Sequence, residues 1–198
     1  MTRTDADADA SGQNRTVSTP FPLASGKSAG YRRDQVDEFL ARARNSYEQG
    51  DGAETMTATE IRRTAFAVKR KGYSARHVDA AMDRLEEVFF ERERRARIAE
   101  VGEDAWWAET RQLLSEVRGR LERPRGKRFK RRGILASGYR RAQVDAFLDQ
   151  VSAMLRSEGS LTATEVRGVV FHSQWRGYNE DQVDALLDAV VVLILSTR

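Results

Sequence analysis

Two histidines are the first residues in this chain whose type could do chemistry. His77 and His172 lie far apart in the sequence, and the chain contains no cysteine that could join either of them as a metal ligand. Structural and catalytic zinc sites are typically built from cysteine and histidine ligands at short, fixed spacings, and no such spacing occurs here. The sequence therefore predicts no metal site.

Four aspartates hold the same place in four copies of a repeated stretch: Asp37, Asp79, Asp145 and Asp184. A catalytic pair of carboxylates must converge in one cleft, whereas four equivalent positions indicate a structural role. Across a predicted helical hairpin, Arg62 and Arg167 are the candidate ion-pair partners of Asp79 and Asp184.

The sequence does not predict a nucleotide-binding site either. Gly26-Lys27-Ser28 resembles the end of a phosphate-binding loop, but Phe21 stands where such a loop has its first glycine. No strand is predicted before it. With no catalytic constellation in view, we predict a protein that is not an enzyme and holds no cofactor.

One segment is strongly basic and contains no acidic residue. It holds seven basic side chains, interrupted by Pro124 and Gly126: Arg123, Arg125, Lys127, Arg128, Lys130, Arg131 and Arg132. Such a run attracts phosphate groups, either of nucleic acid or of anionic lipid. A solvated charged linker between two domains is the other interpretation.

The repeated stretch predicts the secondary-structure elements on which these residues lie. Its four copies begin at Gly30, Gly72, Gly138 and Gly177, and each runs Gly-Tyr, four variable residues, Val-Asp. The structural residues of the repeat are Tyr31, Val36, Asp37, Tyr73, Val78, Asp79, Tyr139, Val144, Asp145, Tyr178, Val183 and Asp184. Because 108 residues separate Gly30 from Gly138 and 105 separate Gly72 from Gly177, one two-motif unit is written twice.

The fourth copy has the features of a helix start. Asn179 suits the N-cap, Gln182 can reach back to that cap, and Tyr178 with Val183 forms a hydrophobic staple. Gly177 is expected to allow a sharp turn before the cap. The caps vary between copies while the Tyr–Val pairs do not, so the staple is expected to contribute more to stability than the cap.

Two further helix starts precede the second and fourth copies. Thr57 with Glu60, and Thr162 with Glu165, have the spacing of capping boxes, and a short helix is expected after each. The second and fourth copies therefore predict a helix, a turn and a helix.

The middle of the chain predicts longer helices. A mixed-charge helix follows Tyr73, Gly102 is expected to break it, and residues 106–121 form an amphipathic stretch that begins with Trp106 and Trp107. We expect this stretch to support self-association, as a homodimer.

The combined pattern resembles the N-terminal domain of DivIVA, a bacterial scaffold of cell poles and division septa, and related repeat proteins of the DivI1A type. The fourth copy matches the family pattern best of the four, from Leu161-Thr162 through Trp175-Arg176-Gly177-Tyr178 to Leu187-Asp188. In that family the segment is a helical hairpin whose loop touches the membrane, followed by a long parallel coiled coil. This chain has four motifs instead of one, and no long coiled coil follows the last.

The resemblance implies where a membrane would be touched. Trp175 and Arg176 stand where the family has an exposed aromatic residue and an arginine, and Arg70 and Lys71 stand there in the second copy. Tryptophan favours the membrane interface, and arginine can bind a lipid phosphate. These four residues are the candidate membrane contacts.

Together these features predict an all-α protein of duplicated short helical hairpins with a longer, coiled-coil-like helical middle. The expected segments are a disordered tail (1–20), a first half (21–100), an amphipathic helix (101–122), the basic linker (123–133) and a second half (134–198). The resemblance implies a cytoplasmic scaffold of cell division or polar growth, peripheral at the inner membrane face, that recruits cell-division or cell-envelope proteins.

The alternative is a basic helical protein that binds nucleic acid. The basic segment and the helix-turn-helix-like units favour it. The formal net charge, however, is only +4, and Glu180 and Asp181 lie at the start of a helix where a DNA-reading protein would favour hydrogen-bond donors.

Overall fold

A computed structural model describes residues 20–26, 28–49 and 56–197 of the chain. The predicted disordered tail lies almost wholly outside these residues. The chain groups into two compact units: unit 1 contains Met1–Asn45 and Ala65–Ala81, and unit 2 contains Ser46–Thr64 and Met82–Arg198. These bounds cut across the two halves expected from the sequence, because two helices run from one unit into the other.

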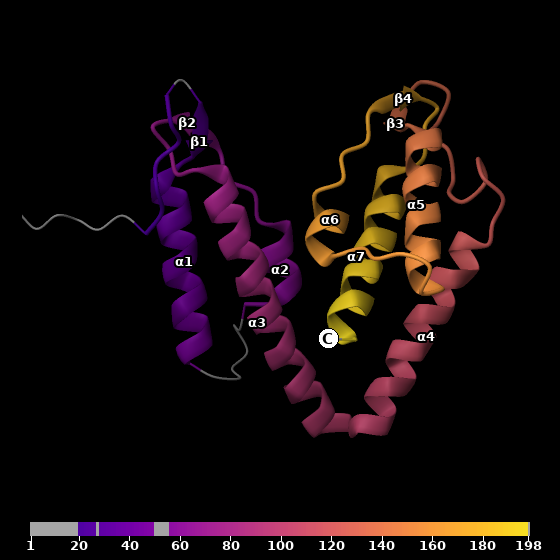
Figure 1. The fold of residues 1–198 in the computed structure, drawn as a ribbon, viewed down its shortest axis with the longest axis horizontal. Coiled ribbons are helices and arrows are strands. Elements are labelled where there is room, and N and C mark those ends of the chain that lie inside the picture. Colours follow the sequence, from indigo (N-terminus) through magenta and orange to yellow (C-terminus); the bar gives the residue numbers. More distant parts are fainter. Residues whose placement is uncertain (1–19, 27, 50–55, 198) are drawn as a thin grey trace, which may run out of the picture. The chain divides into compact units, whose positions relative to one another are not determined.

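The described residues form mainly helices, as the sequence predicted, joined by four three-residue strands that it did not predict (Figure 1). The elements in chain order are β1 (Ala29–Tyr31), α1 (Arg33–Glu48), α2 (Ala58–Arg63), β2 (Val68–Arg70), α3 (Ala75–Val101), α4 (Glu103–Leu121), β3 (Ser137–Tyr139), α5 (Arg141–Leu155), α6 (Ala163–Arg167), β4 (Ser173–Trp175) and α7 (Glu180–Ser196). The order strand, helix, helix, strand, helix thus occurs from β1 to α3 and again from β3 to α7.

The helix starts largely follow the predicted chemistry. Thr162 forms a complete capping box with Glu165, and Thr57 Oγ1 accepts a hydrogen bond from the Glu60 backbone N–H at 3.0 Å. Asn179 caps α7 by accepting from the Gln182 N–H at 3.0 Å. The expected return contact from Gln182 to the cap is wrong, because its Oε1 accepts instead from the Lys130 N–H at 3.1 Å.

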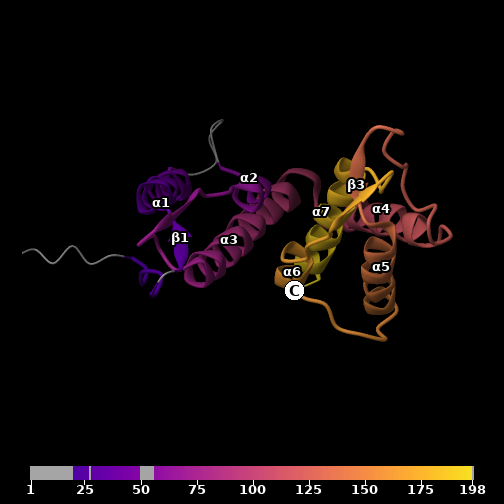
Figure 2. The same cartoon turned by 90° about the horizontal axis from the view of Figure 1, so that it is seen from above.

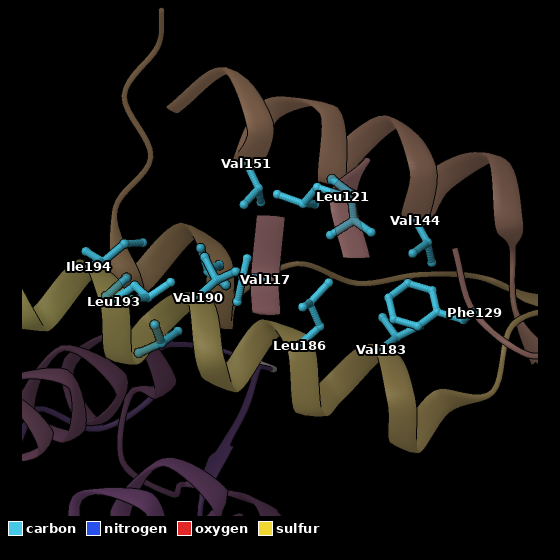
Figure 3. Close-up of a cluster of buried hydrophobic side chains, with 14 of the residues drawn as sticks. Val117, Leu121, Phe129, Val144, Val151, Val183, Leu186, Val190, Leu193 and Ile194 are labelled. Carbon is cyan, nitrogen blue, oxygen red and sulfur yellow. The ribbon is translucent and has the colours of Figure 1, made fainter. Parts of the chain in front are cut away.

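Unit 2 has a continuous apolar core centred on α7. Helix α7 packs against α4 and α6, and α4 also packs against α5 (Figures 1 and 2). Val144 of α5 and Val183 of α7 face each other beside the Phe129 ring (Figure 3). Fully burying a valine or phenylalanine side chain contributes about 1.5–3 kcal/mol. The buried members are Val117, Leu121, Phe129, Val144, Leu148, Val151, Ala163, Val166, Tyr178, Val183, Leu186, Val190, Val191, Leu193, Ile194 and Leu195.

The amphipathic stretch of the middle segment becomes α4. Gly102, at a φ of 87°, separates it from α3, as expected. Val117 and Leu121 are buried in the unit 2 core, and the Arg94 guanidinium lies 4.9 Å from the centre of the buried Trp106 ring. Self-association stays a prediction, but the apolar face on which it was based packs within the chain.

Candidate functional site

The four copies of the repeat meet in pairs. In unit 1, β1 pairs antiparallel with β2, and in unit 2, β3 pairs antiparallel with β4. Beside each sheet, the motif tyrosines exchange backbone hydrogen bonds. The N–H to C=O distances are 2.9 and 2.8 Å between Tyr31 and Tyr73, and 3.0 and 2.9 Å between Tyr139 and Tyr178. The repeated sequence is therefore the contact surface between two of its own copies.

The motif glycines are needed for space. A Cβ added to Gly138 would lie 2.1 Å from the Tyr178 carbonyl oxygen, and one added to Gly177 would lie 2.5 Å from the Gly138 carbonyl oxygen. Gly30 and Gly72 are equally confined in unit 1. None of the four has a positive φ. The chain does turn before α7, where the Gly177 N–H donates to the Gln174 carbonyl oxygen at 2.9 Å, but the left-handed residue of that turn is Arg176. The glycines let two backbone segments approach closely.

The motif tyrosine of one copy reaches the motif aspartate of its partner copy. The Tyr73 hydroxyl donates to the Asp37 carboxylate at 3.0 Å, and the Tyr178 hydroxyl donates to Asp145 at 3.0 Å. Tyr139 donates to Asp184 at 3.4 Å. Burial first, and then the nearby carboxylate, raises the pKa of each of these tyrosines, so the phenol stays protonated and remains a donor.

A phenylalanine packs on each motif tyrosine. The ring centres are 5.5 Å apart for Phe21 and Tyr73, and 5.2 Å apart for Phe129 and Tyr178. The other two motif tyrosines contact Phe66 and Phe171, at 5.6 and 5.3 Å. The first two pairs are edge-on and the other two are tilted. Edge-on aromatic pairs add about 0.5–1.5 kcal/mol beyond area burial.

The predicted ion pairs of Arg62 and Arg167 with the motif aspartates are wrong. Within unit 2, both arginines converge on Glu86, which is buried, with Nε to carboxylate distances of 2.8 Å for Arg62 and 2.7 Å for Arg167. Arg62 also contacts Asp188 and Arg167 contacts Asp83, at 3.2 and 3.0 Å. Asp83 and Asp188 occupy equivalent places in the second and fourth copies, so these contacts are reciprocal.

Part of the basic segment is buried in unit 2 instead of forming a solvated linker. The Arg128 side chain is buried, donates to the Asp145 carbonyl oxygen at 2.8 Å and pairs with Asp149 at 2.6 Å. Arg125 also pairs with Asp149, and the Arg132 guanidinium lies 3.9 Å from Glu180. The basic side chains that remain exposed are Arg123, Arg125, Lys127, Lys130 and Arg131.

Beside the β3–β4 sheet of unit 2, several apolar side chains are exposed to solvent. Trp175 is 59% exposed, and Ile134 and Leu135 in the connection before β3 are 69% and 85% exposed. The Arg176 N–H donates to the Ala136 carbonyl oxygen at 3.1 Å, which ties this connection to the turn after β4. We call Ile134, Leu135, Trp175 and Arg176 the apolar tip. Sequence analysis predicted Trp175 and Arg176 as contacts but did not identify Ile134 and Leu135.

The corresponding turn of unit 1 has a different chemistry. Lys71 has a φ of 59°, close to the 52° of Arg176, so the two turns have the same backbone form. The cleft beside it has a volume of about 620 Å³ and is lined by five basic and two acidic side chains: Arg32, Arg33, Lys69, Arg70, Lys71, Asp34 and Asp37. We call this the cationic cleft. It includes the predicted contacts Arg70 and Lys71.

The histidines stay in separate local contacts. His77 Nδ1 lies 2.9 Å from the Ser74 hydroxyl, and His172 Nδ1 lies 2.9 Å from the Gln143 amide nitrogen. Across residues 20–26, 28–49 and 56–197, no group of three His, Cys, Asp or Glu side chains is placed to hold a metal ion. None of the helices in the described part of the chain combines the length and the apolarity required to span a membrane.

Comparison of the chain with protein-family models, with curated proteins and with solved structures found no match.

Proposed function

We propose that this protein is a non-enzymatic scaffold that attaches to the surface of an anionic membrane and recruits other proteins there. The observation that carries the proposal is the apolar tip. Three large apolar side chains, Ile134, Leu135 and Trp175, are mostly exposed, and the Arg176 backbone is hydrogen-bonded to the connection that carries Ile134 and Leu135. Exposed apolar side chains grouped in this way mark interaction surfaces.

The chemistry of the tip matches a lipid interface. Tryptophan prefers the boundary between headgroups and acyl chains, while leucine and isoleucine gain by leaving water. Arg176 can donate two parallel hydrogen bonds to a lipid phosphate. Each basic residue near an anionic surface adds about 1 kcal/mol. One tip therefore binds weakly, and a second attachment, from Arg70 and Lys71 or from another chain, raises the avidity.

The resemblance to DivIVA-type proteins supports the biological part of the proposal. On this resemblance we propose that the protein acts peripherally at the cytoplasmic membrane face in cell division or polar growth, with cell-division or cell-envelope proteins as partners. Duplicated helical hairpins, a coiled-coil-like contact along the α3–α4 segment and a homodimer belong to the same proposal.

Binding of nucleic acid is the competing function. The cationic cleft and the exposed basic side chains Lys127, Lys130 and Arg131 would attract phosphates of either kind. The apolar tip favours membrane binding over nucleic-acid binding, because the side chains of Ile134 and Leu135 have no charge or hydrogen-bond donor that could bind a phosphate backbone.

We expect Trp175→Glu and Leu135→Glu each to weaken binding to phosphatidylglycerol vesicles about tenfold, since each removes apolar contact and adds repulsion. The measurement is co-sedimentation at low salt. Val170→Glu is the matched control: Val170 is 82% exposed but lies between α6 and β4, outside the tip.

Equal binding by wild type, Trp175→Glu and Leu135→Glu would contradict the proposal, as would a wild type that ignores the vesicles. A salt-sensitive mobility shift with duplex DNA, in a protein that ignores the vesicles, would favour nucleic acid.

A further inference from the structure

The cationic cleft of unit 1 carries more positive charge than its own acidic residues balance. Five basic side chains face two acidic ones, which leaves a local net charge of +3. Arg32 is paired with Asp34 at the rim. Asp37 accepts a hydrogen bond from the Tyr73 hydroxyl. The acids of the cleft are thus already engaged.

The other basic side chains of the cleft have no acidic partner. No ion pair joins Arg33, Lys69, Arg70 or Lys71 to an acid within the part of the chain that the structure describes. All four are exposed. An anionic segment could therefore contact them without displacing an existing partner.

The sequence contains an anionic segment shortly before the first residue of this cleft. Residues 1–19 precede Pro20, and Pro20 itself lines the cleft. The segment contains Asp5, Asp7 and Asp9 at every second position, separated by alanines. We infer that the acidic segment Asp5–Asp9 binds in the cationic cleft of its own chain.

The length of the connection allows this contact. Ten residues separate Asp9 from the first described residue, and an extended chain spans about 3.3–3.6 Å per residue, so the acids can reach any part of the cleft and fold back into it. In an extended segment, residues at alternate positions point to one side, so all three carboxylates would face the basic side chains together. Attachment at the rim also gives the segment a high effective concentration there.

Docking of the acidic segment would regulate membrane binding, because the proposed function uses Arg70 and Lys71 of the cleft as a second attachment to the membrane. While the acidic segment occupies the cleft, Arg70 and Lys71 are not free to bind lipid phosphates. This consequence rests on the proposed function, but the docking of the segment does not.

The docking can be measured without any membrane. Because the chain has no cysteine, Ala8→Cys allows a single nitroxide label next to the three aspartates. At 50 mM salt we expect the label to broaden the NMR amide signals of residues 32–34 and 69–72. The broadening should fall markedly, to the level of a tethered segment that does not dock, when Asp5, Asp7 and Asp9 are changed to Asn, and should fall similarly at 500 mM salt, where charges are screened within a few ångströms.

Broadening that is equal in the labelled wild type and in the labelled triple Asn variant would overturn the inference, as would the absence of broadening at 50 mM salt. A second variant tests the cleft: Lys69→Gln with Arg70→Gln should reduce the broadening to the same level, while Arg111→Gln with Lys127→Gln, two exposed basic residues of unit 2, should leave it unchanged.

Vesicle binding then separates the docking from its consequence. With phosphatidylglycerol vesicles, we expect the triple Asn variant to bind about five- to tenfold more tightly than wild type. The matched control neutralises three exposed acids outside the cleft, Glu38→Gln, Asp104→Asn and Glu122→Gln. If control and variant gain equally, the segment does not regulate the membrane surface. If neither wild type nor variant binds vesicles while the broadening persists, the proposed function fails and the docking stands.

Discussion

Replacing Gly177 with alanine is expected to lower the free energy of unfolding of unit 2 by about 3 kcal/mol or more. An added Cβ would lie 2.5 Å from the carbonyl oxygens of Gly138 and Tyr139 and 2.6 Å from the Gly138 carbonyl carbon. All three atoms belong to the backbone, so no side chain can rotate out of the way. The two motif loops would have to separate, which would break the reciprocal hydrogen bonds between Tyr139 and Tyr178.

The measurement is urea unfolding followed by circular dichroism. Gly119→Ala is the matched control, because an added Cβ there meets nothing within 4 Å and Gly119 lies inside α4. Alanine is the better helix former by about 0.5–1 kcal/mol, so this control should be slightly stabilising. A Gly177→Ala protein as stable as wild type would show that the loops do not approach as closely as described.

The second large effect is expected at Asp145, which holds together a buried group in unit 2. Asp145 accepts from the Tyr178 hydroxyl at 3.0 Å and from the Gly126 N–H at 2.7 Å, and its carboxylate lies 3.8 Å from the Arg128 guanidinium. Asp145→Ala leaves a buried arginine with one fewer counter-charge and a buried phenol without its acceptor. Breaking a buried charge pair on one side typically costs about 3–5 kcal/mol.

The equivalent change in unit 1 gives the comparison. Asp37 also accepts from a motif tyrosine, Tyr73, but it is exposed and pairs with no arginine in the described residues. Asp37→Ala should therefore cost only about 1 kcal/mol, the usual value of one hydrogen bond. If both variants lose the same stability in urea, the buried charge of Arg128 contributes nothing, and our description of this group is wrong.

The sequence was sufficient to predict the helical class and most helix boundaries. The capping boxes at Thr57 and Thr162 and the break at Gly102 depend on residues that are close together in the chain, so their pattern is local. Val144 and Val183 were also correctly assigned to structural positions, and both are fully buried. Local spacing identifies such positions because a helix buries every third or fourth residue.

The sequence did not reveal that the copies pair with each other. The short strands exist only because two distant loops meet, and nothing in three residues such as Ser173–Trp175 predicts this. The repeat itself nevertheless carries a signal of the pairing. Gly, Tyr and Asp recur together because the glycine of one copy admits the backbone of the other, and the tyrosine of one reaches the aspartate of the other.

Two features of the site were also hidden for physical reasons. A run of basic residues looks like a solvated linker, and its burial at Arg128 depends on Asp145 and Asp149, which are distant in sequence. Ile134 and Leu135 look like ordinary core residues in a sequence, and only the fold shows that they are exposed beside Trp175.

The most direct test of the proposed membrane attachment is to locate the Trp175 ring when vesicles are added. The protein is mixed with phosphatidylglycerol vesicles that contain bromine on their acyl chains, and tryptophan fluorescence is compared between wild type and Trp175→Phe. Trp106 is buried and Trp107 is half-buried, and both lie in α4, so the quenching that is lost in Trp175→Phe reports on Trp175 alone. Attachment through the apolar tip predicts strong quenching in wild type that is lost in Trp175→Phe. Vesicles that bind the protein without quenching it, or that quench both proteins equally, would contradict attachment through this tip.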